Sequence, residues 1–157
     1  TLAAGLNHVA KYGALGDVVN LSLGAYSPAG CPHTSYPVGT AIQALANEGV
    51  FVCMSAGNDG GYASSNYPGC IDGTRIITVG ALNCNNSLAG YSNYGAGVDF
   101  VAVGTNVYSC WKNGEYRTLS GTSMATPVVS GILISRGWPV SGPMVNCNGT
   151  MTPIATR

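Results

Sequence analysis

The stretch Gly121-Thr122-Ser123-Met124-Ala125-Thr126-Pro127 decides how this chain is interpreted. The apolar residues that follow predict a helix over about Ser123–Ser135, which places Ser123 where a glycine-containing loop enters the helix. The N-terminus of a helix offers free N–H groups and the positive end of the helix dipole, and both favour negative charge that develops nearby. Serine is also a common cap at this position. A lone serine here would be a cap, so a functional interpretation depends on other motifs.

The composition limits the classes of protein to which the chain can belong. Its 157 residues suffice for one domain with a hydrophobic core. Charged residues make up only 8% of the chain and the formal net charge is zero, so nucleic acid and anionic membranes are poor candidates for partners. The apolar runs are too short to predict a membrane span. A surface rich in Ser, Thr, Asn, Tyr and Gly favours a secreted, extracellular protein.

The hydrophobic pattern predicts an α/β fold. Apolar strands that alternate with helices through short connections indicate a mostly parallel sheet that helices cover. A hairpin is expected around Asn113-Gly114, and the tail 137–157 is expected to be irregular and to pack on the domain formed by residues 1–136. The predicted helices are Leu2–Tyr12 and Val38–Ala46 besides the one after Gly121, and the predicted strands are Val18–Leu23, Val50–Met54, Ile76–Ala81 and Val98–Val103.

Two further motifs follow predicted strands. Ser55-Ala56-Gly57-Asn58 stands at the carboxyl end of one strand, and Asn20-Leu21-Ser22-Leu23-Gly24 includes the end of another. Open α/β sheets place their binding sites at the carboxyl ends of the strands. By itself, Asn58 is better explained as a turn residue, because Asn58-Asp59-Gly60 is favourable turn sequence.

Together the three motifs resemble the subtilisin-like serine peptidases, over residues 1–136 and with only the carboxyl-terminal half of that catalytic domain represented. The resemblance implies a three-layer α/β fold in which the sheet is incomplete. It also implies that the substrate is a polypeptide. Ser123 would be the nucleophile and Asn58 the side-chain donor to the oxyanion. Ser22, Leu23 and Gly24 would form one wall of the pocket for the residue before the scissile bond, and Ser55, Ala56 and Gly57 the facing wall.

The rest of the catalytic triad is expected elsewhere. In this family the aspartate and histidine motifs precede the segments found here, and neither His8 nor His33 stands in such a motif. We therefore expect a preceding segment, or another chain, to supply the Asp and His, and we expect this chain alone to be a poor peptidase. The alternative is a catalytically inactive extracellular module that assembles with other copies or chains through its incomplete sheet.

Two weaker matches accompany the main motifs. Tyr67-Pro68-Gly69 resembles a family turn that often contains a cis proline. Asp99, with the backbone near Thr74–Ile76, resembles a structural calcium site of several members, although a plain surface aspartate fits as well because calcium needs more oxygen ligands than one carboxylate. The family requires no other cofactor.

The six cysteines are expected to form disulfides in an oxidising compartment, in pairs that the sequence does not identify. Cys53, inside an apolar strand, is the one for which a free buried thiol is a real alternative. Three Asn-x-Ser/Thr sequons begin at Asn20, Asn85 and Asn148. The first lies in a predicted strand and is expected to be incidental, whereas the other two lie in loop-like sequence that suits a glycan.

Overall fold

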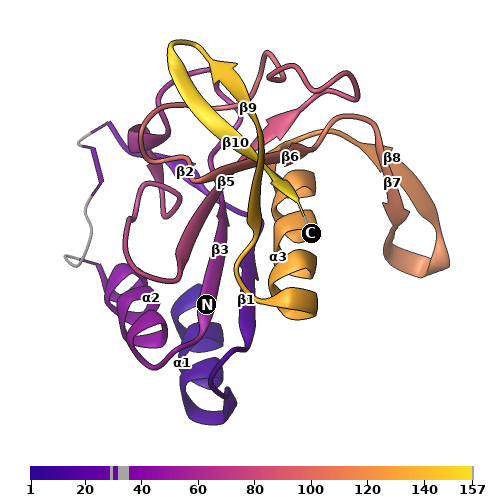
Figure 1. The fold of residues 1–157 in the computed structure, drawn as a ribbon. Coiled ribbons are helices and arrows are strands. Elements are labelled where there is room, and N and C mark those ends of the chain that lie inside the picture. The colour runs from indigo at the N-terminus through magenta and orange to yellow at the C-terminus, as the bar shows by residue number, and fades with distance from the viewer. Residues whose placement is uncertain (29, 32–35, 157) are drawn as a thin grey trace.

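The computed structural model describes residues 1–28, 30–31 and 36–156 and has a six-stranded sheet at its centre (Figure 1). The strand order is β1-β3-β5-β6-β10-β9. The first four of these strands are parallel and neighbours in the sheet, with Val19 beside Val52, Cys53 beside Ile77 and Gly80 beside Val101. Their bounds are Val18–Leu21 (β1), Phe51–Ser55 (β3), Ile76–Leu82 (β5) and Phe100–Val103 (β6).

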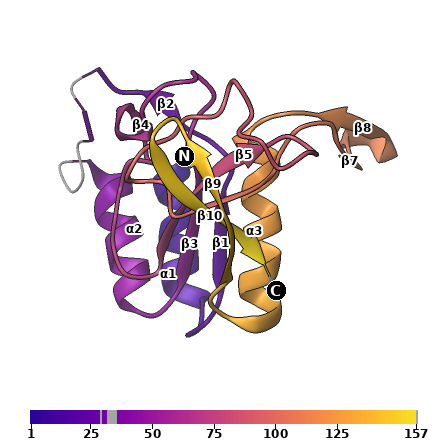
Figure 2. The ribbon, with the colours of Figure 1, turned by 45° about the horizontal axis from the view of Figure 1, so that its top comes forward.

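Helices cover both faces of this sheet. On one face α1 (Leu2–Tyr12) and α2 (Pro37–Asn47) pack over a core that includes Val52 and Met54 of β3. The intervening Cys53 points to the other face, where α3 (Thr122–Arg136) packs. Because both faces are covered, the strands are continuous apolar runs rather than alternating ones. The predicted three-layer α/β fold is confirmed, and Figure 2 shows the layers from a second direction.

The prediction of an irregular tail is wrong. Residues Val140–Cys147 (β9) and Thr150–Thr156 (β10) form an antiparallel hairpin, and β10 continues the main sheet by pairing parallel to β6, with Ile154 opposite Val101. The turn at Asn148-Gly149 has positive φ at both residues, as a tight hairpin requires. The tail lacks a strong hydrophobic pattern because β10 buries small or polar side chains, Thr152 and Ala155, against the domain.

Two small two-stranded sheets flank the carboxyl ends of the strands. Strand β2 (Ala25–Tyr26) pairs with β4 (Asn66–Tyr67), which follows the short 3₁₀ turn η1 (Ala63–Ser65). The predicted hairpin around Asn113-Gly114 is confirmed. It projects from the body of the molecule (Figure 1), and its elements are β7 (Val107–Cys110), η2 (Lys112–Gly114) and β8 (Tyr116–Leu119).

One pair of cysteines is bonded. Cys31 and Cys70 form a disulfide that joins the segment after β2 to the segment after β4. Cys84 and Cys110 are free and exposed, and Cys53 and Cys147 are free and buried. Burial raises the pKa of the Cys53 thiol to about 12, so Cys53 is an unreactive core residue. The expectation of disulfides therefore holds for one pair only, and the free-thiol alternative is the right one for Cys53.

Candidate active site

Ser123 lies in the first turn of α3 but does not cap the helix. The cap residue is Gly121, which makes no side-chain hydrogen bond, and the helix begins at Thr122. The Ser123 hydroxyl instead donates a hydrogen bond of 3.2 Å to the main-chain oxygen of Ser22, just beyond β1. This hydroxyl is half-buried and held at the junction of sheet and helix by a single weak acceptor. The simple capping interpretation is therefore wrong.

Pro127 explains why Ser22 and Ser123 are linked in both directions. In a regular helix the N–H of residue 127 would bond to the carbonyl of residue 123, but proline has no N–H. The Ser123 carbonyl oxygen therefore needs another donor, and the Ser22 hydroxyl supplies it at 2.8 Å. The two serines, 101 residues apart in the chain, thus hold the carboxyl end of β1 against the first turn of α3.

Asn58 stands directly beside this turn. Its Oδ1 accepts hydrogen bonds from the Thr122 main-chain N–H at 2.8 Å and from the Thr122 hydroxyl at 2.9 Å. Because Oδ1 faces Thr122, the amide N–H₂ group of Asn58 is turned away from Thr122 and remains available as a donor. Thr122 is completely buried and also accepts a hydrogen bond from Gly57 N–H, so the amide orientation is set by a rigid partner.

A cavity of about 350 Å³ opens beside Ser123. Leu23 and Gly24 line it from one side and Ser55 and Gly57 from the other, and the Ser55 hydroxyl donates to the Leu23 carbonyl at 3.2 Å where the two segments meet. Ser22 reaches Ser123 but does not line the cavity, and Ala56 is completely buried behind the wall. The remaining lining residues are Ala25, Tyr26, Asn58, Asp59 and Asn66.

Sequence reasoning missed Tyr26 and Asn66 as lining residues. They come from β2 and β4, where they face each other in register, and each of these strands is only two residues long. The adjacent Tyr67–Pro68 peptide is cis, as the resemblance implied. The Tyr67-Pro68-Gly69 turn motif, which lies next to Asn66, was the one feature of the sequence that could have pointed to these lining residues.

The glycines in the walls are required by close packing. Gly57 has φ +102°, and a Cβ atom there would collide with the side-chain amide of Asn93. A Cβ on Gly24 would lie 2.8 Å from the amide nitrogen and oxygen of Asn66. These two glycines therefore let the Asn66 side chain fit between the two walls.

Asp99 lies away from this cavity, on the loop before β6. Its Oδ2 accepts a hydrogen bond from Thr78 N–H at 2.8 Å, and burial raises the pKa of the carboxyl to about 6. Within the described ranges no cluster of three or more His, Cys, Asp or Glu side chains could hold a metal. Any calcium ligands besides Asp99 would have to be largely main-chain or water oxygens, and a calcium site here stays a prediction.

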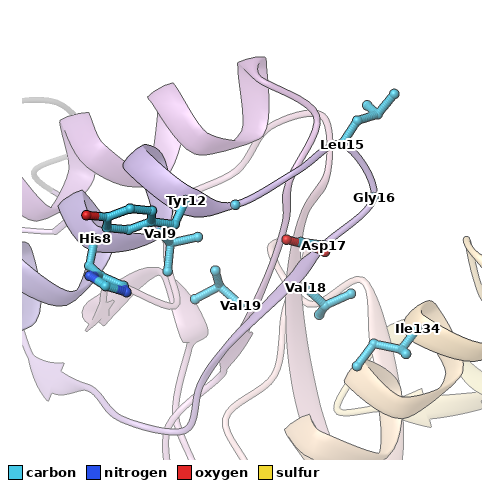
Figure 3. Close-up of a pocket in the computed structure, with 10 residues that line it drawn as sticks. His8, Val9, Tyr12, Leu15, Gly16, Asp17, Val18, Val19 and Ile134 are labelled. Carbon is cyan, nitrogen blue, oxygen red and sulfur yellow. The ribbon is translucent and has the colours of Figure 1, made fainter.

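The structure places His8 far from Ser123. The His8 ring packs 4.7 Å from the Tyr12 ring, in a cavity that Ile134 also lines (Figure 3). Ile134 is eleven residues along α3 from Ser123, which corresponds to about 16 Å along the helix axis. His33 lies outside the described residues. No helix in the portion described is both long and apolar enough to cross a membrane.

Known proteins resemble this chain in sequence and in structure. Proteinase T of Parengyodontium album is 40% identical over 117 residues, which cover 74% of this chain and 37% of that protein. Subtilisin BL of Lederbergia lenta is 42% identical over 114 residues, covering 73% of this chain and 39% of that protein. The crystal structure of a cold-adapted subtilisin-like serine proteinase aligns with a TM-score of 0.73 at 33% identity, over 83% of this chain and 44% of that one.

The chain therefore spans less than half the length of these three relatives. The family model of the subtilases matches residues 3–134, from α1 to near the end of α3. The matched range includes Ser123, Asn58 and both walls of the cavity, and the β9–β10 hairpin lies outside it. On these grounds the chain belongs to the subtilase family of serine peptidases.

Proposed function

We propose that this chain is the nucleophile-bearing part of a secreted serine endopeptidase whose Asp and His are supplied by another segment or chain. The observation that carries the proposal is the arrangement of Ser123 between the Asn58 amide and the 350 Å³ cavity. A peptide whose side chain enters this cavity would present its carbonyl carbon to the Ser123 hydroxyl. The alternative of an inactive assembly module offers no reason for an asparagine oriented in this way.

The chemistry follows from three groups. The Ser123 oxygen would attack the carbonyl while its proton passes to the histidine supplied from outside, because a free serine hydroxyl is a weak nucleophile. The resulting oxyanion would be stabilised by the Asn58 N–H₂ group and by the Ser123 main-chain N–H, since the other N–H groups of the first turn of α3 already donate to Asn58 Oδ1 or to the Gly121 carbonyl. Without the histidine, the oxyanion donors and binding alone leave a residual acceleration of about 10³–10⁴-fold over water.

The open edge of the sheet supports an additional segment. Strand β1 has β3 as its only neighbour in the sheet among the described strands, so one side of β1 has no strand partner. Beside it lies a cavity of about 620 Å³ between α1 and α3 (Figure 3). Leu15 and Ile134 at its rim are 79% and 72% exposed, unlike the core residues behind them. A segment that carries Asp and His would cover this apolar edge; self-association of the chain through the same edge is the competing outcome.

Secretion is supported by the Cys31–Cys70 disulfide, which is stable in oxidising compartments. For glycosylation, Asn85 and Asn148 are exposed at turns, whereas the Asn20 side chain is bonded to Ser22 and Ser130. A calcium ion at Asp99 is part of the same proposal and is tested in the Discussion.

A fluorophosphonate probe tests the proposed nucleophile. In the complete catalytic domain we expect covalent labelling at Ser123, found by peptide mass spectrometry, and loss of labelling in Ser123→Ala. The matched control is Ser135→Ala, which alters an exposed serine at the other end of α3. This chain alone should label far more slowly. If the complete domain does not label although Asp and His motifs are present, the proposed function is wrong.

A further inference from the structure

We propose that the cavity beside Ser123 selects substrates whose residue before the scissile bond, the P1 residue, ends in hydrogen-bond donors, with lysine and arginine favoured and glutamate and aspartate rejected. The selecting groups are the Asn66 amide oxygen and the Asp59 carboxylate. The inference rests on the proposed function, because it requires that substrates enter this cavity.

Asn66 forms a polar part of the cavity wall. Its side chain is only 4% exposed, and its Nδ2 donates to the Ser55 carbonyl at 3.1 Å. This bond sets the orientation of the amide and uses Nδ2, so Oδ1 is the amide atom that can accept a hydrogen bond from a ligand. Among the described residues, none donates a hydrogen bond to Oδ1. Oδ1 is not one of the fully buried side-chain atoms that lack a partner, so it keeps some access to solvent, and a ligand in the cavity that brings a donor can bond to it.

The packing around Asn66 keeps the amide in this position. A Cβ atom on Gly24 would lie 2.8 Å from the amide, and one on Gly57 would lie 2.9 Å from Oδ1 itself. Gly69 approaches from a third side, since its Cβ would lie 3.0 Å from Nδ2. The amide is therefore enclosed by backbone and has little freedom to rotate. Its acceptor is preorganised for a donor that enters between the two walls.

Asp59 adds a negative charge to the same cavity. It follows Asn58 directly, lines the cavity and is exposed. Its main-chain N–H donates to Asn93 Oδ1 at 3.0 Å, and the Asn93 amide donates to its carboxylate at 3.4 Å, so the residue is anchored. The ten lining residues include this one carboxylate and no Lys, Arg or His. A cationic side chain in the cavity would be attracted, and an anionic one would meet an unfavourable charge with no compensating cation.

The Asn66 oxygen and the Asp59 carboxylate can be tested separately with pairs of substrates whose P1 side chains have similar size. Lysine and norleucine have similar chain lengths, but only lysine brings donors and charge. Glutamine and glutamate have the same shape, and only glutamate brings negative charge. We expect the ratio of kcat/KM to favour lysine over norleucine by about tenfold. Glutamine should be favoured over glutamate by at least about tenfold, since both the charge and the missing donor act against glutamate.

The test uses the complete catalytic domain and peptide substrates that differ only at P1. Asp59→Asn should reduce the glutamine-to-glutamate ratio by about two- to fivefold, as expected for an exposed charge. Asn66→Leu should reduce the lysine-to-norleucine ratio. The control is Glu48→Gln, which removes an exposed carboxylate next to α2, at the end of the sheet opposite the site. It should leave both ratios as they are.

The results that would overturn this P1 preference differ from those that would overturn the proposed peptidase function. If the domain labels at Ser123 and cleaves peptides but prefers norleucine to lysine, or if Asp59→Asn leaves the glutamine-to-glutamate ratio unchanged, the inference is overturned while the peptidase stands. If Asn66→Leu fails to fold, the wild-type ratios and the Asp59 variant still decide the matter. If Ser123 does not label and no peptide is cleaved, the proposed function fails, and this inference fails with it.

Discussion

The Asn58 side-chain oxygen accepts two hydrogen bonds from Thr122, one from its main-chain N–H and one from its hydroxyl. The amide of Asn58 is thereby oriented before any substrate is present, and its N–H₂ group is the part left free. Preorganised donors stabilise a developing oxyanion more than donors that must reorient during the reaction. Thr122 is therefore expected to act through Asn58 as a positioning residue.

Removing the Asn58 amide should lower kcat. In the complete domain, Asn58→Ala should decrease kcat by about 10²–10³-fold with little change in KM, because the lost interaction forms only in the transition state. Thr122→Val, which removes one of the two bonds that orient the amide, should give a smaller loss in the same direction. Asn47→Ala, at an exposed position at the end of α2, is the control. Steady-state kinetics in which KM rises and kcat stays constant would contradict the oxyanion role.

Ser22 and Pro127 should be energetically coupled. Ser22→Ala removes the donor to the Ser123 carbonyl and should lower the free energy of unfolding by about 1–2 kcal/mol. With Pro127→Ala in place, the new N–H at residue 127 can bond to that carbonyl, and Ser22→Ala should then cost less. A double-mutant cycle by urea unfolding should give a coupling of about 1 kcal/mol. Additive effects would mean that the proline is not the reason for the Ser22 bond.

Asp99 should make stability depend on pH. Burial raises the pKa of its carboxyl from 3.8 to about 6, so the folded protein holds this proton more tightly than the unfolded chain. The stabilising contribution is complete below the unfolded pKa and is lost as pH rises through about 6. In the presence of a chelator, the wild type should lose about 1–2 kcal/mol more than Asp99→Asn between pH 4 and pH 7.

The same experiment examines calcium at Asp99. A bound calcium ion would favour the charged carboxylate and reverse this trend. If added calcium stabilises the wild type at pH 7 but not Asp99→Asn, the calcium proposal is supported. If calcium has no effect on either protein while the pH dependence persists, Asp99 is a buried acid without a metal.

The Cys31–Cys70 disulfide should support both stability and the cavity. It closes a loop across a sequence separation of 39, and its removal in Cys31→Ser/Cys70→Ser should lower the free energy of unfolding by about 3–4 kcal/mol. It also brackets the β2–β4 pair that carries Tyr26 and Asn66, so KM should rise more than kcat falls. The double variant of the free, exposed cysteines, Cys84→Ser/Cys110→Ser, should change neither quantity. Equal effects of the two double variants would argue against a specific role of the disulfide.

The parts of the fold that the sequence predicts are those set by local patterns. Leu2–Tyr12 is helical as predicted, because its apolar face repeats with the helical period and packs on α2. The strands at Phe51–Ser55 and Ile76–Leu82 are continuous apolar runs that only a doubly covered sheet explains. The tail hairpin was missed because its pairing with β6 depends on tertiary contacts of small side chains, and no local period marks it.

In the candidate site, too, local motifs could be predicted from the sequence and features that depend on tertiary contacts could not. The motifs around Ser123, Asn58 and Gly57 are contiguous in sequence, and the structure brings them together. Asn66 and Tyr26 could not be found in this way, because they enter the cavity through a two-residue pairing between distant segments. Whether Ser123 caps the helix or bonds to the end of β1 could likewise not be decided from local sequence. It depends on Ser22, which is 101 residues away.

Both walls of the cavity, the Asn58 amide and Ser123 belong to this one chain, whereas the proposed function takes the base that would activate Ser123 from another segment or chain. Choice of substrate and activation of the nucleophile would then be carried by separate stretches of polypeptide. Such a division makes recombination between relatives informative: a chimera that joins this chain to the first half of another subtilase should take its P1 preference from this chain and its pH–rate profile from the donor of the histidine.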